Sequence, residues 1–202
     1  MKDLGFHQIG FALPSKEGGL GGQLSYFGNT GYQELSVLAA YGRRLGERLD
    51  VGILFSHFRL GIAGTESASA TTAGLGLRMH VSGSLVAGIQ VFNPMQVTLQ
   101  PEGSRLPAQY AAGLGWEVSP QLLIGMELFK IGSSPPGLGG GIRYHPHQGI
   151  SAQCGLESGT GSPYISAGIA LANFELTTSG SLHPQLGLTP ALQLTYRPLK
   201  SE

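Results

Sequence analysis

Strict alternation of apolar and polar residues is the feature that most constrains the fold of this chain. In the stretch TTAGLGLRMHV, residues 71–81, the apolar side chains fall on one parity and Thr, Gly, Arg and His on the other. Successive side chains leave a β-strand on opposite faces, so this period of two predicts a strand with one apolar face. A soluble sheet alternates in the same way. The pattern therefore leaves open whether the apolar face meets a protein core or lipid.

The same alternation recurs along nearly the whole chain and predicts an all-β fold. No stretch of useful length has the 3.6-residue periodicity of a helix. Most of the predicted strands have about ten residues, close to the roughly 9–11 that cross a bilayer at a tilt. The thirteen predicted strands lie near residues 4–13, 19–28, 31–43, 49–61, 70–81, 84–92, 108–118, 122–130, 137–145, 149–156, 163–171, 174–181 and 188–197.

Composition narrows the class of protein further. The chain has 33 glycines and only 12% charged residues, where an average soluble domain has roughly 25%. Twelve acidic residues balance twelve Lys and Arg, so no basic surface argues for a nucleic-acid partner. The single cysteine, Cys154, excludes an intramolecular disulfide framework. No apolar run approaches the roughly 18 residues of a transmembrane helix.

The connections between strands favour a membrane barrel over a soluble sandwich. Short links such as VSGS and VSPQ alternate with longer ones such as AGTESASA and NPMQVTLQPEGSRLP. Short turns at one end and longer loops at the other are the plan of an outer-membrane barrel, with the short turns in the periplasm. The sequence thus predicts an antiparallel up-and-down transmembrane β-barrel, a single outer-membrane domain over residues 1–202.

Aromatic and charged residues fit the two faces of such a barrel. Four aromatic residues share the apolar parity near the short-turn ends of their strands, where an interfacial girdle would lie. Glycines on the opposite parity would leave room in the lumen for a solute. The predicted girdle is Tyr41, Trp116, Tyr144 and Tyr196. The predicted lumen-facing charged residues are Arg78, Glu117, Glu127, Arg143, Glu157, Glu175 and Arg197, which either pair across the lumen or line a solute route.

The number of predicted strands, thirteen, is odd. A closed single-chain bacterial barrel usually has an even number of strands, with both chain termini in the periplasm. If the short turns are periplasmic, one strand before Met1 is expected, so that the full-length parent has fourteen. The first residues, MKDLGFHQIGFALPSKEGG, do not have the shape of a signal peptide. We therefore expect Met1 to be an internal start, or this chain to be a trimmed or decayed version.

Several motifs in order make the chain resemble a family of Bacteroidota outer-membrane proteins related to PorV and, more distantly, to FadL-type fatty-acid transporters. The resemblance covers essentially the whole chain. It rests on ALP…GGLG…LSYFG (Ala12 to Gly28), AYGRRLGERLDVGI (Ala40 to Ile53), VFNP (Val91 to Pro94), SPPGLGGGIRY (Ser134 to Tyr144) and HPQLGLTPALQLTY (His183 to Tyr196).

The resemblance implies a fourteen-stranded barrel with an N-terminal signal and a lumenal segment rich in Asn, Pro, Ala and Gly. We expect residues 1–202 to contain neither of these two segments. The resemblance also implies a non-enzymatic role in the bacterial outer membrane. That role is either FadL-like transport of a hydrophobic small molecule or PorV-like partnership with type IX secretion components. Two alternatives stay open: a soluble lipocalin-like binding barrel, and a non-functional barrel fragment that aggregates through unpaired strands.

The sequence offers little for chemistry at a site. His145 and His147 could form a metal pair, but two imidazoles without a third ligand make a poor site. The chain has no G-x-S-x-G nucleophile motif, and its serines cluster in loops. We therefore predict no enzyme activity, no metal and no cofactor. Asn93 and Pro94 are expected to stop a strand at the outer rim or to serve a loop gate.

Overall fold

The computed structural model describes residues 4–16, 18–101, 103–158, 161–183 and 187–198. Within these ranges the chain forms thirteen strands and no helix, hence none long and apolar enough to cross a membrane. The strands are β1 (Gly5–Pro14), β2 (Gly18–Gly28), β3 (Tyr32–Leu45), β4 (Leu49–Ile62), β5 (Ala68–His80), β6 (Leu85–Phe92), β7 (Gln109–Ser119), β8 (Leu122–Ile131), β9 (Gly137–His147), β10 (Ile150–Glu157), β11 (Ser162–Leu171), β12 (Phe174–His183) and β13 (Gly187–Tyr196).

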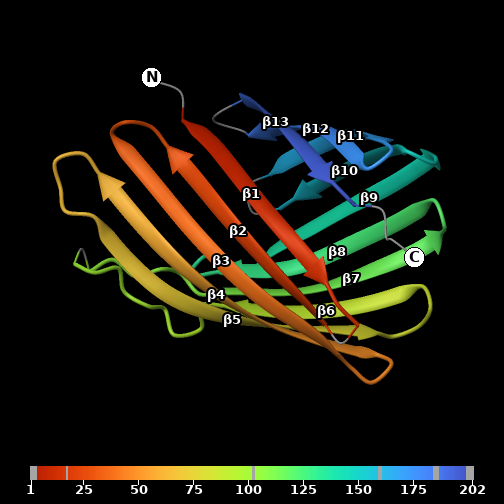
Figure 1. The fold of residues 1–202 in the computed structure, drawn as a ribbon, viewed down its shortest axis with the longest axis horizontal. Helices are drawn as coiled ribbons and strands as arrows, with labels where there is room; N and C mark the ends of the chain where they lie inside the picture. The colour runs from red at the N-terminus through yellow and green to blue at the C-terminus, as the bar shows by residue number, and fades with distance from the viewer. Residues whose placement is uncertain (1–3, 17, 102, 159–160, 184–186, 199–202) are drawn as a thin grey trace. The chain divides into compact units, whose positions relative to one another are not determined.

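The all-β, up-and-down prediction is confirmed. The strands form one antiparallel sheet in sequence order from β1 to β13, each bonded to its neighbour in the chain (Figure 1). Every predicted strand is present, and its ends differ from the prediction by no more than two residues. Alternation located the strands this closely because turns rich in Gly, Ser, Pro and Asn interrupt it at regular intervals.

The strands group into two compact units within this order. The first comprises Met1–His80, Gly88–Ala111 and Ile131–Ser134, and so contains β1 to β5 whole. The second comprises Val81–Ala87, Ala112–Lys130 and Pro135–Glu202, and so contains β9 to β13 whole. The assignment of residues 1–202 to a single domain stays a prediction.

In the first unit one face of the sheet is apolar and exposed. The pairing registers place one apolar residue from each of five neighbouring strands in a single row across β1 to β5. That row is Leu13, Leu20, Tyr41, Ile53 and Leu75, and all five side chains are exposed. A soluble sheet buries such a row under a second layer, but here no layer of the described residues covers it.

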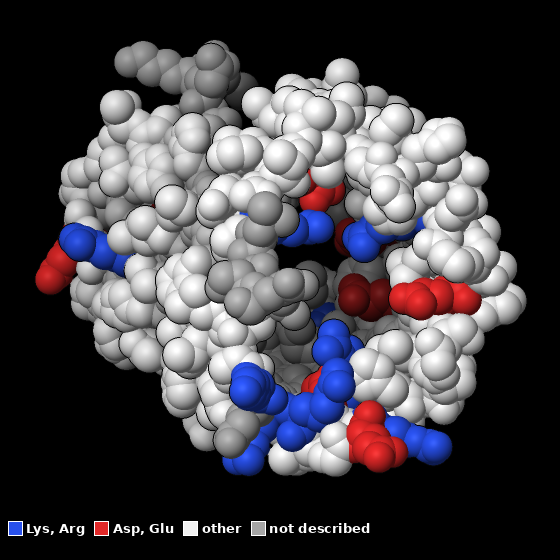
Figure 2. All heavy atoms as spheres, turned by 45° about the vertical axis from the view of Figure 1, so that its right-hand side comes forward, with Lys and Arg blue, Asp and Glu red and all other residues white. Residues whose placement is uncertain are grey.

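The second unit repeats the arrangement. The registers of β10 to β13 place Ile150, Ile169, Leu176 and Leu194 in one row, and all four side chains are exposed. Leu192 of β13 exposes 74% of its surface. In Figure 2 most of the visible surface is formed by uncharged residues, with Lys, Arg, Asp and Glu gathered in a few places. Rows of exposed large apolar side chains are unusual on the surface of a soluble monomer.

The hydrophobic core is correspondingly small. Among the described residues the buried apolar side chains are Ala68, Ala70, Leu99 and Ala108, all in the first unit. They lie where the connection 93–108, between β6 and β7, folds back onto the sheet. The rest of the fold is held by the backbone ladders between strands.

Some glycines make room for aromatic rings rather than for a solute. A Cβ atom on Gly155 would lie 2.5 Å from the ring of Tyr164, which lies opposite it on β11. A Cβ on Gly22 would lie 2.6 Å from the ring of Phe11, its partner on β1. Each glycine gives a neighbouring ring a flat surface on which to lie. At Gly155, on the polar face, the expected free space is therefore occupied by Tyr164.

Candidate functional site on the polar face of the first unit

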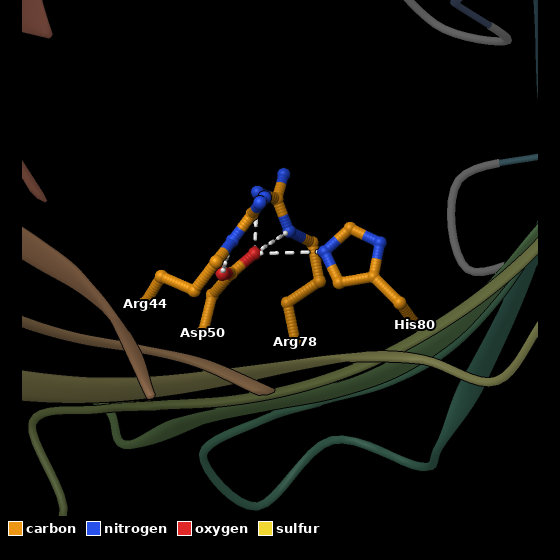
Figure 3. Close-up of polar contacts among 4 residues, drawn as sticks. All are labelled: Arg44, Asp50, Arg78 and His80. Carbon is orange, nitrogen blue, oxygen red and sulfur yellow. Dashed lines mark hydrogen bonds and ion pairs between the residues drawn. The ribbon is translucent and has the colours of Figure 1, made fainter. Parts of the chain in front are cut away.

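A cluster of four charged or ionisable side chains lies on the polar face of the first unit, centred on Asp50 near the start of β4 (Figure 3). Arg44 donates from Nε to Asp50 Oδ1 at 3.0 Å. Arg78 donates to Oδ2 from Nε at 2.8 Å and from Nη2 at 2.7 Å. His80 Nε2 lies 3.0 Å from the same oxygen. We call these four residues the Asp50 cluster.

The local sequence explains why these side chains meet. Gly46 adopts φ 67° in the tight turn between β3 and β4, a conformation that glycine takes at little cost. The hairpin then pairs Arg44 with Asp50, and the β4–β5 register pairs Asp50 with Arg78. His80 lies two residues further along β5 and so faces the same side. Three adjacent strands, β3, β4 and β5, therefore each contribute a charged or ionisable side chain at the same height along the sheet.

The cluster carries more positive than negative charge. One carboxylate faces two guanidiniums and an imidazole. The Asp50 side chain is only 16% exposed, whereas those of Arg44 and Arg78 are 60% and 59% exposed. The acid is thus shielded beneath the two bases, and the cluster presents its positive groups outward.

A second polar centre lies toward the opposite end of the same face, where neutral groups form hydrogen bonds around Asn93. This residue follows β6 directly, has φ 51°, and is fully buried, with 0% of its surface exposed. Its Oδ1 accepts from Thr72 Oγ1 at 2.8 Å and from the backbone N–H of Val97 at 3.1 Å. Its Nδ2 donates to the carbonyl of Leu106 at 2.8 Å. All the polar groups of the side chain are therefore engaged.

Around Asn93 the described residues of the connection 93–108 form a compact layer on the polar face. Ser69 at the start of β5 and Gln100 exchange two backbone hydrogen bonds of 2.8 and 2.9 Å. Leu99 packs with Ala68 and Ala70, and partly buried residues surround them. Those surrounding residues are Phe58, Leu60, Val97 and Leu106. Residues 93–108 thus cover this end of β4 and β5, and Asn93 fixes the layer to the sheet.

The charged residues predicted to face the lumen lie on the face opposite the apolar rows wherever the strand registers show it, and some of them pair. Arg78 belongs to the Asp50 cluster. In the second unit Arg197 Nη2 lies 2.7 Å from Glu175 Oε2. Glu127 and Glu157 both lie opposite Gly139, one on each side of it. Whether this face lines a lumen stays a prediction.

Two further predicted charged residues, like Glu127 and Glu157, show no ion pair in the described part of the chain. Arg143 lies opposite Leu123 on β8 and Gln153 on β10. Glu117 lies near the end of β7, where its backbone N–H donates to the carbonyl of Ser84. Both side chains are exposed. The structure thus brings only part of the predicted set into contact.

The four aromatic residues of the predicted girdle are exposed and lie near the ends of their strands. Tyr41 is exposed on the apolar face of the first unit, close to the end of β3. Trp116, Tyr144 and Tyr196 are exposed in the second unit, near the ends of β7, β9 and β13. These are positions that an interfacial girdle would use, and the girdle itself stays a prediction. Asn93 and Pro94 do end β6, as expected.

Three of the four members of the Asp50 cluster, Arg44, Asp50 and His80, were not predicted from the sequence. Arg78 was picked out by parity alone, strand by strand. The prediction lacked the strand register. The tight turn in RRLGER places Arg44 opposite Asp50, and this pairing cannot be seen from the alternation within one strand. For metals, no group of three or more His, Cys, Asp or Glu residues close enough to hold an ion occurs in the described ranges.

The apolar face of the second unit carries a shallow hollow of about 510 Å3 over β9 to β13. Small residues, Ala152, Cys154 and Ala167, occupy its middle, and Ile142 and Leu188 contribute apolar atoms beside them. No charged residue lines it. The free thiol of Cys154 lies in this hollow between Ile142 and Ile165 of the neighbouring strands.

No family model and no curated protein matches this chain. A solved structure described as "Asymmetric conductivity of engineered proteins" aligns with a TM-score of 0.48 and 7% sequence identity, covering 95% of this chain and 89% of that one. A similarity this distant identifies neither a family nor a function.

Proposed function

We propose that this chain is a non-enzymatic β-barrel protein of a bacterial outer membrane, with its apolar face toward lipid. The observation that carries the proposal is the exposure of whole rows of large apolar side chains in both units, from Leu13 to Leu75 and from Ile150 to Leu194. Such rows cost free energy in water but are stabilising in hydrocarbon. Strands β2 to β12 each pair with a neighbour on both sides, so their backbone groups find partners within the sheet, as a membrane requires.

Within that class we favour a PorV-like partner in secretion. The polar face of the first unit carries the Asp50 cluster and the neutral hydrogen bonds of Asn93. Charged side chains are poor neighbours for a fatty acid chain, so this face does not suit the passage of a hydrophobic solute. The role predicts that secretion components co-purify with the protein from its native membrane. Repeated purifications without any such component would count against it.

FadL-like handling of a hydrophobic small molecule is the second candidate function. The hollow around Cys154 favours it, because an uncharged concave surface of this size, open on the lipid-facing side, suits an acyl chain that enters sideways from the bilayer. Mass spectrometry of lipid extracted from purified protein would test it. One fatty acid per chain, lost when Ala167→Phe fills the hollow, would favour transport over partnership.

The orientation of the two faces can be tested with the single native cysteine. An environment-sensitive dye on Cys154 should be quenched by nitroxide lipids after the full chain is refolded into vesicles. The matched control is Gln153→Cys in a Cys154→Ser background, which moves the dye by one residue to the opposite face. Quenching of the first dye alone supports the membrane proposal.

Other outcomes support the remaining hypotheses. A monomer that stays in solution without detergent, with iodide reaching the dye at position 153 but not the dye on Cys154, would favour the soluble lipocalin-like barrel, whose apolar face lines its interior. Aggregation without a band that shifts between unboiled and boiled samples on an SDS gel would favour a non-functional fragment.

A further inference from the structure

We propose that Arg44 and Arg78, held on Asp50, form a binding site for an oxyanion, a carboxylate or phosphate group, on the polar face of the first unit. The proposal goes beyond the proposed function, because anion binding at this cluster does not depend on where the apolar face lies. It can therefore fail or succeed independently of the membrane assignment.

The unused hydrogen-bond donors of the cluster carry the proposal. Each guanidinium has five N–H groups and no acceptor. Asp50 takes one of these from Arg44 and two from Arg78. The other N–H groups of both residues have no hydrogen-bond partner among the described residues, and both side chains are well exposed. The cluster therefore offers several charged donors that a ligand can reach.

Asp50 also brings the two guanidiniums close together. Both reach the same carboxylate, from β3 on one side and from β5 on the other (Figure 3). Two like charges at this distance repel, and one carboxylate balances only one of them. A second anion above Asp50 would balance the other. It would also meet guanidinium forks whose geometry matches carboxylate and phosphate oxygens.

The face on which the cluster lies limits the source of the anion. Arg78 shares its face with Thr72, whose hydroxyl is bonded to Asn93, and lies opposite the exposed apolar residues Leu75 and Leu77. A lipid on the apolar face would therefore approach from the wrong side. The oxyanion must come from a free solute or from an acidic side chain of a polypeptide that reaches the polar face.

The ion pair of the second unit provides a matched comparison. Glu175 and Arg197 also form a short contact on the polar face, at 2.7 Å, and Arg197 is exposed. There one carboxylate meets one guanidinium, so the pair has no surplus charge. We expect no oxyanion binding at Arg197.

Calorimetric titration of the full chain in detergent, in a chloride-free buffer, tests the site. The probes are inorganic phosphate and a short polyglutamate peptide, which represent the two sources. Arg44→Gln or Arg78→Gln should weaken binding about tenfold or more, since each removes charge-assisted hydrogen bonds. The double variant should remove binding, and Arg197→Gln should leave it unchanged. Tighter binding of phosphate points to a solute, and tighter binding of the peptide to a polypeptide.

A measurement on the unmodified chain keeps the test valid if a variant fails to fold. Phosphate or peptide should shift the NMR signals of the His80 ring, which touches Asp50. The ring of His57, which is bonded to Thr71 on the opposite face of the same strands, should not shift. The proposal is overturned if neither probe moves His80, or if wild type binds neither probe more tightly than the double variant.

Discussion

Strand β5 carries two polar centres, one toward each of its ends, and they differ in charge, in burial and in hydrogen bonding. Thr72 and Arg78 share one face of this strand. At Thr72 the partner is Asn93, which is neutral, fully buried and fully hydrogen-bonded. At Arg78 the partner is Asp50, in a charged cluster whose bases are mostly exposed. The first centre has no capacity left for a ligand, whereas the second has unused donors.

The difference separates a centre that stabilises the fold from one that is available for binding. A buried amide with its partners in place is costly to disturb, because its loss leaves other buried polar groups without partners. Exposed ion pairs are worth little to stability, because water and salt screen them. We therefore expect substitutions around Asn93 to act on folding, and substitutions in the Asp50 cluster to act mainly on binding.

Asn93→Ala should have the largest effect. It leaves the hydroxyl of Thr72, the N–H of Val97 and the carbonyl of Leu106 without partners, which should cost about 3 to 5 kcal/mol in the stability of the layer 93–108. Trypsin cleavage after Arg105, within that layer, should become at least about a hundredfold faster, at about 1.4 kcal/mol per factor of ten. Time-resolved mass spectrometry of the digest would measure the rate.

Asn93→Gly separates the hydrogen bonds from backbone strain. Asn93 has φ 51°, which glycine adopts freely and alanine does not. If the hydrogen bonds dominate, Asn93→Gly should expose Arg105 to trypsin nearly as much as Asn93→Ala does. A glycine variant as resistant as wild type would show that strain alone explains the alanine result.

Thr72→Val should have a smaller effect at the same centre. It keeps the shape of the side chain but removes the donor of the 2.8 Å bond to Asn93, which we expect to cost about 1 to 2 kcal/mol. Cleavage after Arg105 should rise by about tenfold. The control is Thr71→Val on the opposite face, where the bond to His57 is exposed and its loss should barely change the rate. Equal effects at both positions would contradict the distinction between the faces.

The sequence predicted the strands well and the two centres only in part, for a physical reason. Alternation is a local property, and it placed all thirteen strands and, where it is clean, the side of the strand that is apolar. The neighbours of a polar residue depend on strand register, which turn geometry sets. Arg78 could thus be assigned to the polar face without its partners Asp50 and Arg44. The burial of Asn93 depends on how the long connection 93–108 folds back onto the sheet, and no local sequence pattern predicts that path.

Asp50→Asn should destabilise the chain less than either substitution at the first centre. The amide can still accept a hydrogen bond, but Arg44 and Arg78 lose the charge that offsets their repulsion. Because both bases are exposed, we expect a loss of about 1 kcal/mol at low salt that shrinks in 1 M salt. Urea unfolding at the two salt concentrations would measure it. A loss as large as that of Asn93→Ala, and independent of salt, would contradict the assignment of this cluster to binding.

Arg197→Gln should have the smallest effect of all. The Arg197 side chain is 75% exposed and lies one residue beyond the end of β13, so its ion pair with Glu175 contributes less than about 0.5 kcal/mol. Its partner is 23% exposed and stays hydrated when the guanidinium is removed. The urea midpoint should be unchanged within error at either salt concentration. A loss matching that of Asp50→Asn would mean that the two ion sites share one structural role. The surplus of arginine around Asp50 would then no longer set that cluster apart.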